Sequence, residues 1–171
     1  MLKLIGAMLV IAACTLLGLA KAARYARRPR QLRLLIQVLQ RLETEMTYGA
    51  TPLADALRRI AAQAADPIGA MLLDAAERMD PGGETAKASW QEATRLHWRY
   101  TALQDSEREV WSQLGFTLGV SDREDQVKHL RLAASLLQTE EQVAWEEQRR
   151  YEKMWRSLGV LAGALIVIMM Y

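Results

Sequence analysis

The sequence predicts an all-α protein: an antiparallel helix bundle of about six helices, flanked by an N-terminal and a C-terminal transmembrane helix. Three observations support this prediction. Leu, Ala, Gln, Glu and Arg dominate residues 31–148, and all five favour helices. Apolar residues recur there at spacings of three and four, without the alternation of a β-strand. Uncharged apolar runs lie near both ends, at residues 4–20 and 157–171.

The first apolar run predicts a transmembrane helix over residues 2–23. Basic residues follow it from Lys21 onward, and positive charge stays on the cytoplasmic side of a span. Two alternatives remain open. Ala20-Lys21-Ala22 resembles a signal cleavage site, and residues 11–14 resemble a lipobox that would lipidate Cys14. Either would give a lipid-anchored or secreted helical adaptor, whereas the basic cluster after the run favours an uncleaved span.

The C-terminal end repeats this charge pattern. Residues 149–156 form a basic juxtamembrane segment, and residues 157–171 predict a second transmembrane helix. Both termini would then lie outside the cytoplasm, with the bundle of residues 24–148 inside. Gly159 and Gly163 form a GxxxG motif, which is typical of a close contact between membrane helices. Glycines are also common in membrane helices without that role.

Charge is segregated along the chain. Residues 31–148 carry 12 Lys and Arg against 19 Asp and Glu, a difference of −7, which argues against a nucleic-acid partner. The basic arms are expected to bind anionic lipid headgroups. Their residues are Arg24, Arg27, Arg28, Arg30, Arg149, Arg150, Lys153 and Arg156. One cysteine and two separated histidines predict no metal site, and no phosphate-binding loop is present.

The first bundle helix is expected over residues 31–48, after Pro29 and before Gly49. Its apolar face is Leu32, Leu35, Ile36, Leu39, Leu42 and Met46. Thr51-Pro52 predicts an N-cap and first turn for the next helix, with Leu53, Leu57, Ile60 and Ala61 on its apolar side. Asp66-Pro67 likewise predicts an N-cap and first turn, for a helix whose apolar residues are Ile68, Met71, Leu72, Ala75 and Met79.

Three further helices follow. One spans about residues 85–97, and another is capped by Asp105 and ends near Gly119. The apolar residues of the second are Val110, Trp111, Leu114, Phe116 and Leu118. Ser121 and Glu124 form a capping box for a last helix that continues to the C-terminal run. Its predicted core stripe is Val127, Leu130, Ala134 and Leu137, and residues 138–153 are expected to form a solvated stalk.

Several segments together resemble one family. They are residues 28–33, 39–46, 48–53, 114–119, 121–124, 128–129 and 152–161. In this order they are similar to the stage III sporulation protein AB family, over nearly the whole chain. Ala50 departs from the pattern, because the family often has a polar residue there, commonly His.

The resemblance implies a scaffold in endospore formation. Such proteins belong to the channel between mother cell and forespore, in the outer forespore membrane, with the central domain in the mother-cell cytoplasm. That domain is similar to platform proteins of type II secretion and type IV pilus systems, which couple a secretion-type ATPase to the membrane. The expected partners are this ATPase, other channel subunits and membrane lipids. No catalytic residue, cofactor, nucleic acid or small-molecule substrate is expected.

Two clusters are candidate partner-docking residues. The first is Glu43, Glu45 and Tyr48, and the second is Asp122, Arg123, Glu124 and Lys128. The alternative for the first is a solvated helix end with a turn. The alternative for the second is helix capping with an i,i+4 pair between Glu124 and Lys128. His97 and His129 have no helix-spaced partner ligand, and Trp90, Trp98 and Trp111 are expected in the core.

Overall fold

The structure is a computed structural model that describes residues 26–49, 51–80, 83–119 and 122–170. The predicted N-terminal span, together with Cys14 and Arg24, lies outside the described residues. So do Ser121, one half of the predicted capping box, and the surroundings of Gly159 and Gly163. In the part of the chain that is described, no helix combines the length and apolar character needed to cross a membrane.

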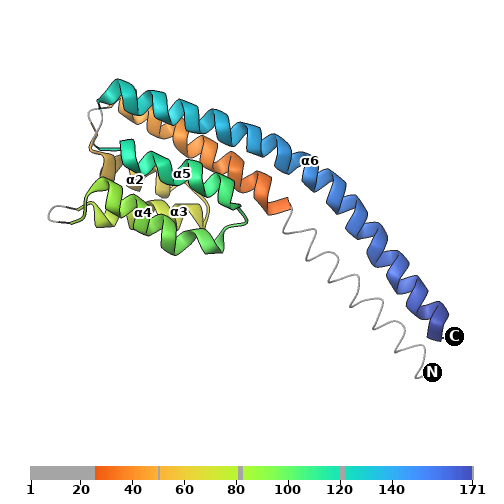
Figure 1. Cartoon of the computed structure of the whole chain (residues 1–171). Helices are drawn as coiled ribbons and strands as arrows, with labels where there is room; N and C mark the ends of the chain where they lie inside the picture. The colour runs from red at the N-terminus through yellow and green to blue at the C-terminus, as the bar shows by residue number, and fades with distance from the viewer. Residues whose placement is uncertain (1–25, 50, 81–82, 120–121, 171) are drawn as a thin grey trace. The chain divides into compact units, whose positions relative to one another are not determined.

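Six α-helices and a short 3-10 turn make up the described residues, with no strand among them, which confirms the all-α prediction (Figure 1). The first helix covers residues 26–48. The others are α2 (Leu53–Ala61), α3 (Ile68–Arg78), α4 (Ala86–His97), the turn η1 (Trp98–Tyr100), α5 (Asp105–Thr117) and α6 (Arg123–Met170). The sequence therefore predicted the number and order of the bundle helices.

The chain divides into two compact units. One is residues 30–141, and the other combines the two ends, whose described parts are residues 26–29 and 142–170. The predicted bundle of residues 24–148 extends beyond the first unit on both sides. Each unit is described separately below.

An antiparallel pair of helices forms one side of the 30–141 unit. The first helix and the beginning of α6 run side by side (Figure 1). Arg33 Nε lies 2.9 Å from Glu141 Oε1, and Arg131 Nε lies 2.7 Å from Glu43 Oε1. At the far end, Arg123 Nη2 donates to the Gly49 carbonyl at 3.1 Å. These three polar contacts form a ladder that keeps the two helices in register.

The remaining helices pack in chain order, α2 on α3, α3 on α4 and α4 on α5. The predicted apolar face of the first helix is buried, at Leu32, Leu35, Ile36, Leu39 and Leu42. Trp90, Trp98 and Trp111 are buried as predicted. The rings of Trp90 and Trp111 stack with centroids 4.5 Å apart, and Trp90 Nε1 donates to the Trp111 carbonyl at 2.8 Å. This pair fixes α4 against α5.

Three helix starts differ from the prediction by one residue. Pro52, not Thr51, is the N-cap of α2, which begins at Leu53. Gln104, not Asp105, is the N-cap of α5, because its backbone N–H donates to the buried carboxylate of Glu107. Pro67, not Asp66, is likewise the N-cap of α3, which begins at Ile68, although the Asp66 side chain accepts from the Ala70 N–H at 3.1 Å. Thr85, expected at about the first position of its helix, is the N-cap of α4 and accepts from the Ala88 N–H at 3.3 Å.

The predicted apolar stripes need several corrections, since Met46, Leu53, Met79 and Val110 are only half-buried. The buried row of α6 within the 30–141 unit is Leu130, Ala133 and Leu137, while Val127 and Ala134 are only half-buried. Ala134 is rotated by about 100° from Ala133 around the helix, so it lies at the flank of the buried row. Phe116 is exposed, and Lys87 Nζ lies 4.3 Å from the centre of its ring.

In the unit made of the chain ends, part of the predicted solvated stalk of residues 138–153 is buried. Ala144 is buried, and Arg28 Nη1 lies 2.6 Å from Glu147 Oε2. Arg28 itself is 5% exposed. Residues 142–148 of α6 therefore pack against residues 26–29, and the prediction of a wholly solvated stalk was wrong for this part.

Candidate partner-docking surface

The structure brings the two predicted docking clusters together at one end of the 30–141 unit. Glu43, Glu45 and Tyr48 lie in the last turns of the first helix, and Asp122 to Lys128 lie at the start of α6. The contacts of Arg131 with Glu43 and of Arg123 with Gly49 join these two segments. We call this surface the docking end: Glu43, Glu45, Thr47, Tyr48, Asp122, Arg123, Glu124, Val127, Lys128 and Arg131.

The two glutamates of the first helix are already paired with cations. Glu43 binds Arg131, and Glu45 Oε2 lies 3.8 Å from Arg59 Nη1 of α2. The side chain of Glu43 is 24% exposed, whereas that of Arg131 is 66% exposed. The outward-facing groups of these pairs are therefore the arginines. The sequence pattern alone could not indicate this, because Arg131 is 88 residues away from Glu43.

An open hollow of about 300 Å³ lies in the docking end. It is lined by Thr47, Arg123, Glu124, Val127, Lys128 and Arg131. Three of these six side chains are cationic and one is anionic. The predicted pair between Lys128 and Glu124 was wrong, since Lys128 Nζ lies 3.3 Å from Asp125 Oδ1 instead.

Tyr48 is the most exposed large hydrophobic side chain of the docking end. It follows Thr47, which lines the hollow, and is 87% exposed. Exposed tyrosines are among the residues that most often carry binding energy in protein interfaces, because they bury a large area for few rotatable bonds. Tyr48 does not line the hollow itself but is exposed in the same last turn of the first helix.

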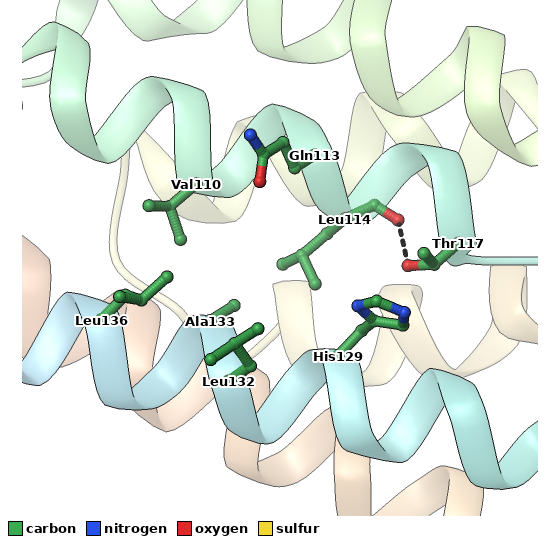
Figure 2. A pocket seen from close by; sticks show the side chains of 8 residues that line it. All are labelled: Val110, Gln113, Leu114, Thr117, His129, Leu132, Ala133 and Leu136. Atoms are coloured by element: carbon green, nitrogen blue, oxygen red, sulfur yellow. Dashed lines mark hydrogen bonds between the residues drawn. The ribbon is translucent and has the colours of Figure 1, made fainter.

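A second groove, which the sequence analysis missed, lies between α5 and α6 (Figure 2). Its walls are Val110, Gln113, Leu114 and Thr117 on α5, and His129, Leu132, Ala133 and Leu136 on α6. The void is small, about 40 Å³, but Leu132 and Leu136 remain 57% and 45% exposed. Their spacing of four residues beside the buried row was the available sequence signal.

The two histidines lie in separate places. His129 lies on the rim of the α5–α6 groove near Thr117, whose hydroxyl donates to the Leu114 carbonyl at 3.0 Å (Figure 2). His97 Nε2 lies 3.3 Å from Asp74 Oδ2, between α4 and α3. Within the described ranges, no group of three or more His, Cys, Asp or Glu side chains could hold a metal ion.

The predicted lipid-binding residues fall into three groups. Arg27, Arg30, Arg149 and Arg150 are exposed, as contact with headgroups would require. Arg28 is buried and is engaged by Glu147. The side chains of Arg24, Lys153 and Arg156 lie outside the description.

Comparisons with known proteins agree on one family. The family description "Stage III sporulation protein AB" matches residues 3–171. The stage III sporulation protein AB of Bacillus subtilis (strain 168) is 41% identical over 170 residues, which cover 99% of each chain. A solved structure titled "Stage III sporulation protein AB (SpoIIIAB)" matches with a TM-score of 0.69 at 40% identity, over 72% of this chain and 98% of that chain. The chain therefore belongs to the stage III sporulation protein AB family.

Proposed function

We propose that this sporulation protein is a membrane-anchored scaffold of the mother cell–forespore channel, which positions a secretion-type ATPase at the membrane. Family membership supports the role in sporulation. The observation that carries the docking role is the convergence of two distant segments, the end of the first helix and the start of α6, on one hollowed surface. Tyr48 and three cationic side chains are presented there together.

The geometry of the antiparallel pair suits a scaffold. The chain enters the 30–141 unit beside the point where it leaves, because Arg33 contacts Glu141. The docking end lies at the opposite end of this pair. From Arg123 to Glu141, α6 rises by about 27 Å, at about 1.5 Å for each of 18 residues. A partner on the docking end is thus held about 27 Å from residues 30 and 141, where the unit continues into the basic arms.

The proposed location follows from the ends of the sequence. Two apolar runs with basic residues on their inner sides support two spans, with the central unit in the mother-cell cytoplasm and lipid headgroups around the exposed arginines. The proposal includes no catalysis, cofactor or nucleic-acid binding by this chain. The intact mass of the membrane-extracted protein distinguishes an uncleaved chain from one that is lipidated at Cys14 or cleaved.

A binding and hydrolysis experiment tests the proposal. The full chain in mild detergent is mixed with the purified secretion-type ATPase of the same organism, and co-elution and ATP turnover are measured. We expect a complex, and no ATP hydrolysis by the chain alone. Hydrolysis by the chain alone, or the absence of a complex at both low and physiological salt, would contradict the proposed function.

A further inference from the structure

We infer that the docking end receives an acidic segment of its partner, whose carboxylates enter the hollow between Arg123, Lys128 and Arg131. The inference rests on the proposed function and specifies the chemistry of the partner at that site. It moves the main binding groups from Glu43 and Glu45, which the sequence offered as candidates, to the cationic side chains that line the hollow.

The first step concerns the donors that remain directed to the hollow. Arg131 uses Nε to bind Glu43, so its two Nη nitrogens lie outside that hydrogen bond. A guanidinium has five N–H donors, and its fork matches the two oxygens of a carboxylate. Arg123 donates from Nη2 to the carbonyl of Gly49. Because this carbonyl is a neutral acceptor, it does not compensate the positive charge of Arg123. Both arginines can therefore bind an additional carboxylate.

The second step concerns the acidic residues nearby. Asp122 Oδ1 accepts from the backbone N–H of Arg123, where it supports the start of α6. Asp125 pairs with Lys128, and both side chains are more than half exposed, at 57% and 70%. Among the residues that line the hollow, Glu124 is the single carboxylate beside three cations. Of these three cations, Lys128 is paired with Asp125 and Arg131 with Glu43, so an acidic segment would meet the uncompensated charge of Arg123 and the remaining Nη donors of Arg131.

The third step concerns the apolar side chains near the three cations. Val127 contributes an apolar side chain to the hollow, and Tyr48 is exposed beside Thr47 at its edge. Exposed ion pairs alone contribute little to affinity, but they steer association and set its salt dependence. We therefore expect the partner segment to combine several Asp or Glu residues with an apolar side chain that packs on Tyr48 or Val127.

Peptide probes test the inference directly. A labelled probe with six glutamates separated by serine and glycine is titrated with the full chain in mild detergent, and its fluorescence anisotropy is measured. A second probe has lysine in place of each glutamate. We expect the glutamate probe to bind at low salt and the lysine probe to bind at least fivefold more weakly. Equal binding of both probes, or tighter binding of the lysine probe, would overturn the inference.

Charge-reversal variants assign the binding to the hollow. R123E, K128E and R131E should each weaken binding of both the glutamate probe and the ATPase at least fivefold, and E124K should strengthen it. The matched control is R108E, an exposed arginine at the start of α5 that does not line the hollow, and it should change binding less than twofold. The double variant E43R/R131E keeps the ion pair with its charges exchanged, which separates lost folding from lost binding. Circular dichroism verifies helical content throughout.

The outcomes separate the two proposals. If the ATPase binds the wild-type chain and the three reversals leave that binding unchanged, the inference is wrong and the proposed function stands. If the glutamate probe behaves as expected but the ATPase does not bind the wild-type chain, the inference about ligand charge stands and the proposed function is wrong.

Discussion

Gly115 of α5 lies directly against the indole of Trp90. A Cβ atom placed on Gly115 would lie 2.8 Å from Trp90 Cδ1, closer than real Cβ contacts allow. The indole cannot easily move away, since it is buried, stacked on Trp111 and hydrogen-bonded to the Trp111 carbonyl. The absence of a side chain at Gly115 therefore determines how tightly α4 and α5 pack.

G115A should lower the free energy of unfolding by about 1–2 kcal/mol. Overpacking of a filled core typically costs about 1–3 kcal/mol, and the better helix propensity of alanine offsets up to about 1 kcal/mol of it. Urea unfolding followed by tryptophan fluorescence measures the change. The matched control is Q113A, an exposed position on the same helix, which should change stability by less than about 0.5 kcal/mol. An unchanged or raised stability of G115A would contradict the packing described.

Single residues also show where prediction from the sequence ends. The helix starts near Asp66 and Thr85 were predictable to within one residue, because both side chains bind backbone groups only a few residues away. The ion-pair partners of Glu43 and Glu45 were not predictable, because the tertiary fold alone brings Arg131 and Arg59 close to them. The sequence therefore placed these residues correctly at two helix ends, but it could not indicate which charges face outward.

At the scale of elements, α6 presents two different apolar faces to its surroundings. Leu130, Ala133 and Leu137 form the buried row. Leu132 and Leu136 line the α5–α6 groove and are about half exposed. Adjacent leucines on one helix thus have very different environments, which gives a direct comparison.

L137A should destabilise the protein by about 2–5 kcal/mol, because Leu137 is 0% exposed and its loss leaves a cavity. L136A removes the same atoms one position earlier, where the side chain is 45% exposed, and should cost less than about 1 kcal/mol. Thermal unfolding monitored by circular dichroism compares the two variants. Similar losses in both would mean that the register of α6 differs from the one described.

The helices themselves were largely predictable, whereas their faces were less so. The first helix repeats leucine on a single face from Leu32 to Leu42, so its buried side followed from spacing alone. On α6, apolar residues occupy more than one face, and only contact with the first helix and α5 decides which are covered. The same ambiguity misplaced Ala134 and Phe116, whose exposure depends on neighbours distant in the sequence.

At the scale of the whole molecule, the 30–141 unit holds its own core. Its buried residues include Leu35, Leu72 and Trp111, which come from three different helices. The first helix and α6 close this unit from the two ends of the sequence. Both are needed, because each buries its apolar row against the rest of the bundle.

A fragment of residues 31–148 should fold alone as a soluble, helical monomer with cooperative unfolding. Circular dichroism and size-exclusion chromatography in detergent-free buffer measure this. The control fragment, residues 31–119, lacks α6 and should be largely unfolded or aggregated, because the buried face of the first helix loses Leu130 and Leu137 as neighbours. A strand-rich spectrum, or an unfolded longer fragment, would be inconsistent with the independent core.

The antiparallel pairing of the first helix with α6 also determines how the domain responds to mechanical force. The chain enters at residue 30 and leaves at residue 141, and these positions are neighbours through Arg33 and Glu141. Tension that separates the two connections loads this contact first, then Arg131–Glu43, and last Arg123–Gly49. The two helices thus separate one contact at a time, and the force reaches the docking end last. A partner held there is shielded from lateral strain between the two connections until most of the pair has separated.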